Sequence, residues 1–440
     1  MKTDVEFGPS TEDILEGLST PDFKALNQQA NNETIKRMKQ AVPILIGIGK
    51  AQDHIPGMHK NLILHAGPPI TWQRASGPLK GAIIAGLIYE GLAKNKSEAE
   101  EVMAKGEVVL APCHDHNAVG PMAGIITSSM SVYIVEDQFS GHRSYSNLSD
   151  DRGDYRGSSI RFGVYDQEAI DYLHWIEDVI APALDQAIRD ENGIDFLPII
   201  GRSLLMGDDC HVMNNAATLI FSRILLPGII RNSKQKKETV QIATQIYQDE
   251  SFPLNPIMAT CKAVADAGSG IPHSSIITAM ARNGTEFGIK VSGLGDTWFT
   301  GLAGVARGIL MPGITPADVN RDMGDSAITE TMGLGGTIKS ISGSYQDSIN
   351  NILKTYNITH SESDLFLIPG IDDRGSPLGY DLLKIIKADT TPTINSGLAQ
   401  KHMNRYQAGI GSLHPPMEAF LKAAVHFLEV EKNQPPSKQP

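Results

Sequence analysis

The densest group of side chains that could do chemistry is Cys113-His-Asp-His-Asn117, which directly follows a predicted strand at residues 107–111. Adjacent strand residues point to opposite faces, so only an alternate pair such as His114 and His116 could share a metal ion. A histidine titrates near neutral pH and can act as a general acid or base. The pattern favours proton transfer by His114 over a metal site, and we expect no bound metal. A packed or solvated histidine is the other interpretation.

Two further segments place acids and histidines together. In Gly207-Asp-Asp-Cys-His211, two acids precede His211 at a predicted helix start, where they could equally complement the helix dipole. Met323-Gly-Asp-Ser-Ala-Ile-Thr-Glu330 forms a predicted loop-to-helix junction, whose backbone N–H groups suit a phosphate or carboxylate. A plain capped helix explains the second segment equally well. The predicted proton carriers and the acids that orient them are His65, His114, His211, Asp325 and Glu330.

Any anionic substrate must be held by specific residues, because the chain carries a net charge of −12. This negative charge argues against sequence-independent electrostatic binding to nucleic acid or to an anionic membrane. Arg and Lys side chains usually form salt bridges at the protein surface. For each candidate cation below, such a salt bridge is the alternative to substrate binding. The candidate substrate-binding residues are Lys80, Arg143, Arg161, Arg282 and Asn283.

Several familiar sites have no support in the sequence. It contains no GxxxxGK[ST], no strand-linked GxGxxG with an acidic follower and no GxSxG, so nucleotide cofactors and a hydrolase nucleophile elbow are not indicated. We expect no cofactor.

The three cysteines form no CxxC pair, and the acidic N-terminus does not resemble a secretory signal. The apolar stretches are too short to span a membrane. A cytoplasmic location is the expectation.

The pattern along the chain predicts an α/β fold, with two mixed α/β segments flanking a mainly helical middle region. Short apolar runs at residues 61–64, 107–111 and 131–135 read as strands, and Arg282-Asn-Gly284 predicts a hairpin. Helical periods dominate over residues 166–268, with a kink at Pro182. The predicted units are an N-terminal helical segment (1–59), a first α/β domain (60–165), a mainly helical region (166–273), a second α/β domain with a C-terminal helix (274–432) and a disordered tail (433–440).

Long motifs in a fixed order make the sequence recognisable. They are Leu64-His-Ala-Gly-Pro-Pro69 with Trp72 and Gly77-Pro78-x-Lys80-Gly81, Pro112-Cys-His114 with Ala118-Val-Gly-Pro-Met122, Asn283-Gly284 with Phe287-Gly288, Val291-Ser-Gly-Leu-Gly295 with Trp298-Phe-Thr300, and Met323-Gly-Asp-Ser-Ala-Ile-Thr-Glu-Thr331. Spread over about residues 60–400, they strongly resemble the YlbE-like family, which includes AllG-type subunits of oxamate carbamoyltransferase.

The resemblance implies a subunit that works with FdrA-like and AllH-like partners in anaerobic allantoin use. The implied reaction is attack of phosphate on the carbamoyl carbon of oxalurate, giving oxamate and carbamoyl phosphate, which carbamate kinase can use to make ATP. The resemblance implies oxalurate, or a related N-carbamoyl acid, as the substrate. The transcarbamylase phosphate signature Ser-Thr-Arg-Thr is missing from this sequence. The chain therefore lacks a complete familiar phosphate site, and we expect it to be inactive without its partners.

Two alternatives stay open from the sequence. One is a metal-dependent amide hydrolase that would use Cys113, His114, Asp115 and His116. The other is a non-catalytic scaffold whose partner carries the whole site.

Overall fold

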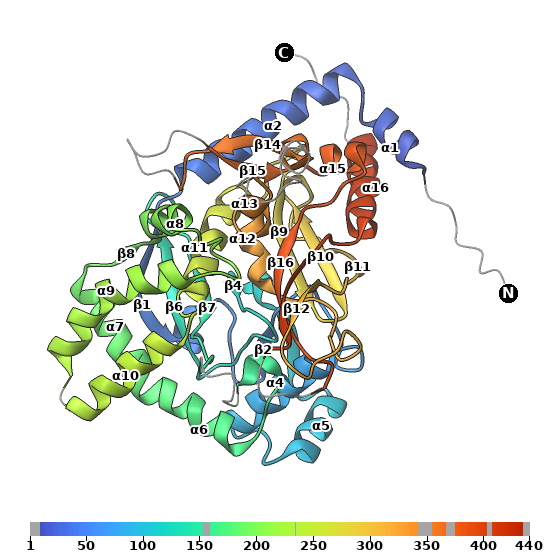
Figure 1. The fold of residues 1–440 in the computed structure, drawn as a ribbon. Helices are drawn as coiled ribbons and strands as arrows, with labels where there is room; N and C mark the ends of the chain where they lie inside the picture. Colours follow the sequence, from blue (N-terminus) through green and yellow to red (C-terminus); the bar gives the residue numbers. More distant parts are fainter. Residues whose placement is uncertain are drawn as a thin grey trace.

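The computed structural model describes residues 9–152, 159–233, 235–341, 354–366, 375–402 and 407–433. Within these residues the protein is an α/β fold, with helices packed around several small mixed sheets (Figure 1). The largest apolar core runs from Ile35 to Ala399 and draws on all four of the predicted segments before the tail. The proposed domain boundaries therefore stay a prediction. No helix among the described residues combines the length and apolar character needed to cross a membrane.

The largest sheet has the strand order β4-β7-β6-β1-β8. Its strands are β1 (Pro43–Lys50), β4 (Ala118–Val119), β6 (Ser131–Asp137), β7 (Arg143–Asn147) and β8 (Ile194–Asp195). Strand β1 corrects the expectation of a wholly helical segment before residue 60, because it pairs with β6 along its whole length. Its run Pro-Ile-Leu-Ile-Gly-Ile is apolar on both faces, as suits a strand between two neighbours. The helices before and after it are α1 (Thr11–Gly17), α2 (Pro21–Gln40) and α3 (Ala51–His54).

The middle region is mainly helical, as predicted. Its helices are α6 (Gln167–Trp175), α7 (Ala181–Asp190), α8 (Phe196–Leu205), α9 (Asn215–Asn232), α10 (Lys236–Gln248) and α11 (Leu254–Ala267). At the predicted kink, a π-helical turn over Ile176–Ile180 lies directly before α7, whose first turn holds Pro182. A proline lacks the N–H that a regular helix would use there, and such turns relieve the mismatch.

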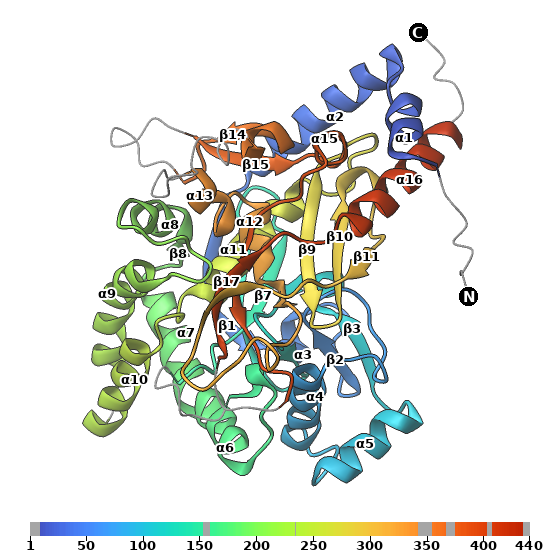
Figure 2. The ribbon, with the colours of Figure 1, turned by 45° about the vertical axis from the view of Figure 1, so that its right-hand side comes forward.

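A second sheet has the order β11-β10-β9-β13. Its strands are β9 (Ile277–Asn283), β10 (Glu286–Val291), β11 (Phe299–Leu302) and β13 (Met323–Gly324). The predicted Asn-Gly hairpin is confirmed, since β9 and β10 pair antiparallel with Arg282 opposite Phe287. Helix α16 (Met417–Asn433) covers this sheet (Figure 2), and Phe420 stacks on Phe287 with ring centroids 5.8 Å apart.

The remaining strands form smaller sheets. They are β2 (Leu62–His65), β3 (Val109–Pro112) and β5 (Ile125–Ile126) in one sheet, β12 (Arg307–Leu310), β17 (Gly409–Leu413) and β16 (Ile394–Leu398) in another, and β14 (Thr359–Ser363) with β15 (Ser376–Tyr380) in a third. The other helices and turns are α4 (Gly77–Tyr89), α5 (Lys96–Lys105), η1 (Cys113–His116), η2 (Ile160–Phe162), η4 (Ser292–Leu294), η5 (Asp325–Ala327), α12 (Ile328–Thr331), α13 (Gly336–Ile341) and α15 (Leu382–Ala388). Strands β2 and β3 run parallel, so the loops after both leave the same sheet edge.

Candidate functional site

Asp325 joins three of the sequence motifs at one buried point. Its two carboxylate oxygens accept the backbone N–H groups of Gly67 (2.7 Å) and Gly120 (2.9 Å), and its own N–H donates to the carbonyl of Gly120. The motif needs glycine before it: Gly324 has φ +110°, and a Cβ there would lie 2.6 Å from the Met122 nitrogen. Asp325 therefore holds the loops after β2, β4 and β13 together.

His114 lies beside this carboxylate and His65 ends the strand that leads to Gly67, and both side chains are buried. Burial lowers the pKa of His65 and holds the pKa of His114 well below its ordinary value, so both rings are neutral at pH 7. His114 Nε2 is 3.8 Å from Asp325 Oδ1, too far for a hydrogen bond. Burial also raises the pKa of the Cys113 thiol, which argues against a thiolate nucleophile. The structure thus groups His65, His114 and Asp325 in the interior.

The Asp325 carboxyl should make stability depend on pH. Burial raises its pKa from 3.8 to about 7, and the two backbone N–H groups and Arg282 oppose this only in part. Between these values the folded chain holds a proton that the unfolded chain has lost, so the stabilising contribution is complete below about pH 4 and disappears as pH rises through about 7.

We therefore expect the unfolding free energy of the wild type, measured relative to Asp325→Asn, to fall as pH rises from about 4 to about 8. Urea unfolding of both proteins across this range gives the difference directly, because groups common to both cancel. A difference that is constant, or that grows with pH, would contradict the raised pKa.

A cavity of about 220 Å³ lies on the other side of these loops. Its walls come from η2, from the loop before α9, from η5 and from the sheet edge at β16 and β17. Described residues that line it include Pro121, Met122, Arg161, His211, Met213, Asn214, Ser326, Gln407 and Ile410. Pockets for drug-sized ligands span about 300–1,000 Å³, so this cavity fits a smaller molecule. Ser326 reaches it directly after the buried Asp325.

His211 and Glu330 form a buried pair at this cavity. His211 Nδ1 lies 2.8 Å from Glu330 Oε1, and their side chains are 3% and 0% exposed. The same oxygen accepts the backbone N–H groups of Gly336 and Asn395. Two backbone donors identify this oxygen as an acceptor, so His211 Nδ1 donates its hydrogen to it, and the other ring nitrogen, Nε2, is not part of this contact. A histidine oriented in this way can take up a proton from a ligand.

The glycines after α12 make room for this pair. Gly335 has φ +56°, and a Cβ there would lie 2.1 Å from Glu330 Oε1 and 3.1 Å from the His211 Cβ. The sequence Met332-Gly-Leu-Gly-Gly336 therefore allows the carboxylate and the imidazole to meet.

The loop before α9 positions His211 through its acids. Asp209 Oδ1 accepts the N–H groups of His211 and Met213, and its other oxygen accepts the Asn395 amide at 2.7 Å. The prediction of a helix start at Gly207 with His211 inside the helix is wrong, because α9 begins at Asn215. Asp209 organises a loop here and does not complement a helix dipole.

The predicted anion holders do not converge. Arg161 reaches the cavity wall, but its Nε donates to Asp150 at 2.7 Å and its Nη2 to Ser149. Arg282 is 0% exposed and makes a two-point ion pair with Asp322 at 2.7 and 3.2 Å. Both guanidinium groups therefore already have carboxylate partners.

Three other predicted residues lie away from the cavity. Arg143 is exposed and pairs with Glu136 across β6 and β7. Lys80 donates to the Gln73 carbonyl and lies over the Trp72 ring. The Asn283 amide donates to the Pro68 carbonyl, and its oxygen accepts two N–H groups in the hairpin turn. These contacts are structural, and the spacing of charges along a sequence does not reveal them.

No grouping of three or more His, Cys, Asp or Glu side chains in the described ranges is placed to hold a metal ion. His114 is buried, whereas His116 is half-buried and donates to the Pro56 carbonyl. The proposed pair therefore does not share a site.

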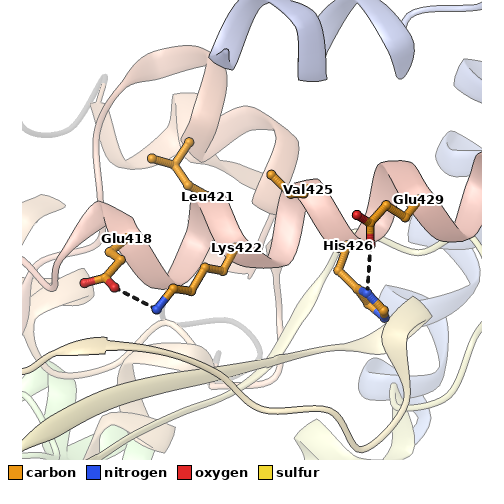
Figure 3. Close-up of a pocket in the computed structure, with 6 residues that line it drawn as sticks. All are labelled: Glu418, Leu421, Lys422, Val425, His426 and Glu429. Atoms are coloured by element: carbon orange, nitrogen blue, oxygen red, sulfur yellow. Dashed lines mark hydrogen bonds and ion pairs between the residues drawn. The ribbon is translucent and has the colours of Figure 1, made fainter. Parts of the chain in front are cut away.

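A shallow groove along α16 (Figure 3) also offers little chemistry: its charges pair along the helix, Glu418 with Lys422 and His426 with Glu429.

Asn214, which also lines the cavity, is not among the residues predicted from the sequence. It is 2% exposed, and its Nδ2 donates to the His211 carbonyl at 2.7 Å. It occupies the N-cap of α9 without capping it through its side chain. An asparagine just before a helical run would normally indicate only a cap.

Comparison with known proteins places the chain in a family. A family model described as oxamate carbamoyltransferase subunit AllG matches residues 108–326. The chain is 36% identical to the Escherichia coli protein of that name, and the match covers 90% of this chain and 96% of the relative. It is 38% identical to the uncharacterized Escherichia coli protein YahG, covering 91% and 86% of the two chains.

A solved structure supports the same relationship. The crystal structure of a conserved protein of unknown function from Enterococcus faecalis V583 matches with a TM-score of 0.87 and 36% identity, over 93% of this chain and all of that one. Identity of this extent over nearly complete chains reflects shared ancestry and a shared fold. The chain belongs to the AllG family.

Proposed function

We propose that this chain is the subunit of a carbamoyltransferase that converts oxalurate, or a related N-carbamoyl acid, and phosphate to oxamate and carbamoyl phosphate. The observation that carries the proposal is the His211–Glu330 pair on the wall of a small cavity. The AllG relative, named as an oxamate carbamoyltransferase subunit, supports carbamoyl transfer as the reaction class.

The pair fits the proton movement that this reaction needs. A phosphate oxygen bonds to the carbamoyl carbon, and the bond from that carbon to the oxamate nitrogen breaks. The nitrogen must gain a proton, and the monoprotonated phosphate must lose one. His211 can carry this proton through Nε2 while Glu330 stabilises the charged ring. Such transfer contributes typically about 10²–10⁴-fold to a rate, and positioning of the reactants contributes more.

The described cavity wall does not hold two anions by itself. Its cation is Arg161, which is already paired with Asp150, while Asp151 and Glu250 also lie on the wall. We therefore assign the missing anion contacts to FdrA-like and AllH-like partner subunits in the same complex.

An apolar rim beside the cavity suits such a contact. Met213 and Ile410 line the cavity and are 43% and 44% exposed. Ile309 on β12 lies opposite Ile410 and is 83% exposed. Exposed apolar side chains that gather around an opening are typical of protein contacts, and a partner there would exclude water from the carbamoyl group.

The experiment that tests the function is a phosphate-dependent assay of the chain with its co-encoded partners, run over a panel of N-carbamoyl acids. We expect carbamoyl phosphate and the free amide in equal amounts, with oxalurate among the best substrates. Phosphate-independent release of ammonia, lost on chelation of a metal, would instead favour the amide hydrolase.

A further inference from the structure

Asn214 has a side-chain oxygen that nothing in the described part of the chain satisfies. The amide orientation is fixed, because the His211 carbonyl can only accept and must therefore face Nδ2. Oδ1 is then the remaining atom, and it is buried without a hydrogen-bond partner. A buried acceptor without a partner is costly and uncommon in folded proteins.

This oxygen also does not make the helix-capping hydrogen bond that is usual at its position. Asn214 is the N-cap of α9, where an asparagine oxygen usually accepts an N–H from the first turn. Here Asp208 accepts the N–H of Ala217 at 2.9 Å instead. The chain thus supplies a second acceptor for the helix end and leaves the oxygen of Asn214, a residue that lines the cavity, without this role.

We infer that Asn214 Oδ1 accepts an N–H of the ligand's terminal carbamoyl group, and so selects a primary carbamoyl NH₂ over a group of the same shape without a donor. The inference rests on the proposed function and names the residue that recognises the transferred group. An amide oxygen is suited to this role because it accepts from a neutral NH₂ and adds no charge next to anionic reactants. Asn214 and His211 line the same cavity, so the recognised group and the proton carrier share one binding space.

The test compares two ligands that differ in one group. Oxalurate ends in a carbamoyl NH₂, and N-acetyloxamate replaces that NH₂ by CH₃ with nearly the same shape. Calorimetric titration of the assembled complex should give oxalurate the tighter binding by about tenfold or more, because the methyl group leaves the buried oxygen unpaired. Equal binding of the two ligands by the wild type would overturn the inference without any variant.

Variants then assign the preference to Asn214. In Asn214→Leu, or in Asn214→Ala if the first does not fold, the ratio of the two affinities should fall to about one. Asn232→Leu is the matched control, since Asn232 also donates to a backbone carbonyl in α9 but lies outside the cavity. It should keep the wild-type ratio. An unchanged ratio in the Asn214 variants would overturn the assignment.

The outcomes separate this inference from the proposed function. Turnover of oxalurate without an Asn214-dependent preference would sustain the function and refute the role of Asn214. An Asn214-dependent preference for carbamoyl NH₂ in a complex that forms no carbamoyl phosphate would sustain the recognition and refute the reaction.

Discussion

Replacing His211 by glutamine should lower phosphate-dependent turnover of the assembled complex by about 10²–10⁴-fold, which is the usual contribution of a general acid–base group. Glutamine keeps the size and polarity of the side chain but cannot carry a proton between phosphate and the leaving nitrogen. The loss should fall mainly on kcat, because proton transfer affects the transition state more than substrate binding. Steady-state kinetics of purified wild-type and variant complexes measure it.

The matched control is His426→Gln on α16, in the open groove of Figure 3. Its side chain is 44% exposed and it lies outside the cavity, so turnover should not change. The scaffold alternative makes the opposite prediction for His211: an assembled complex with full activity. That result would mean that the catalytic residues lie on a partner subunit.

Arg282→Ala should destabilise the fold by about 3–5 kcal/mol, which is typical of breaking a buried ion pair by removing one partner. Asp322 would remain enclosed, with the Ser396 hydroxyl as its remaining side-chain donor among the described residues. The sequence predicts this arginine as a substrate-binding residue. Its complete burial in the structure makes stability the property that changes.

Arg143→Ala provides the comparison, because Arg143 also pairs with one carboxylate, that of Glu136, but at an exposed site. Surface pairs contribute about 0–1 kcal/mol, so its unfolding transition should stay close to that of the wild type. Denaturant unfolding of both variants separates the two cases. Similar small effects for both variants would contradict a large contribution of the buried Arg282–Asp322 ion pair to stability.

The elements were largely predictable because they depend on local patterns. The strands after residues 61, 107 and 131 and the Asn-Gly hairpin each follow from a short run of side chains and a turn signal. Strand β1 was missed because it directly follows a long helix, and its apolar run is short enough to continue that helix by periodicity alone.

The candidate site was predictable only in its residue types. His211 and Glu330 were both proposed, but 119 positions separate them and no local signal joins them. The predicted arginines do not converge on the cavity, and the sequence could not show this for a similar reason. Residue type indicates that a cation is present, but whether it is free to bind a ligand depends on whether a distant carboxylate already pairs with it. Asn214 gave no signal, because its unused oxygen becomes visible only when Asp208 is seen to take over the helix cap.

The most direct test of the central claim measures carbamoyl phosphate formed from oxalurate and phosphate by this chain alone, by its partners alone and by the mixture. The cavity supplies a proton carrier but no unpaired cation among its described lining residues, so activity should arise only in the mixture. Full activity of the isolated chain, or of the partners without it, would contradict a site shared between this chain and its partners.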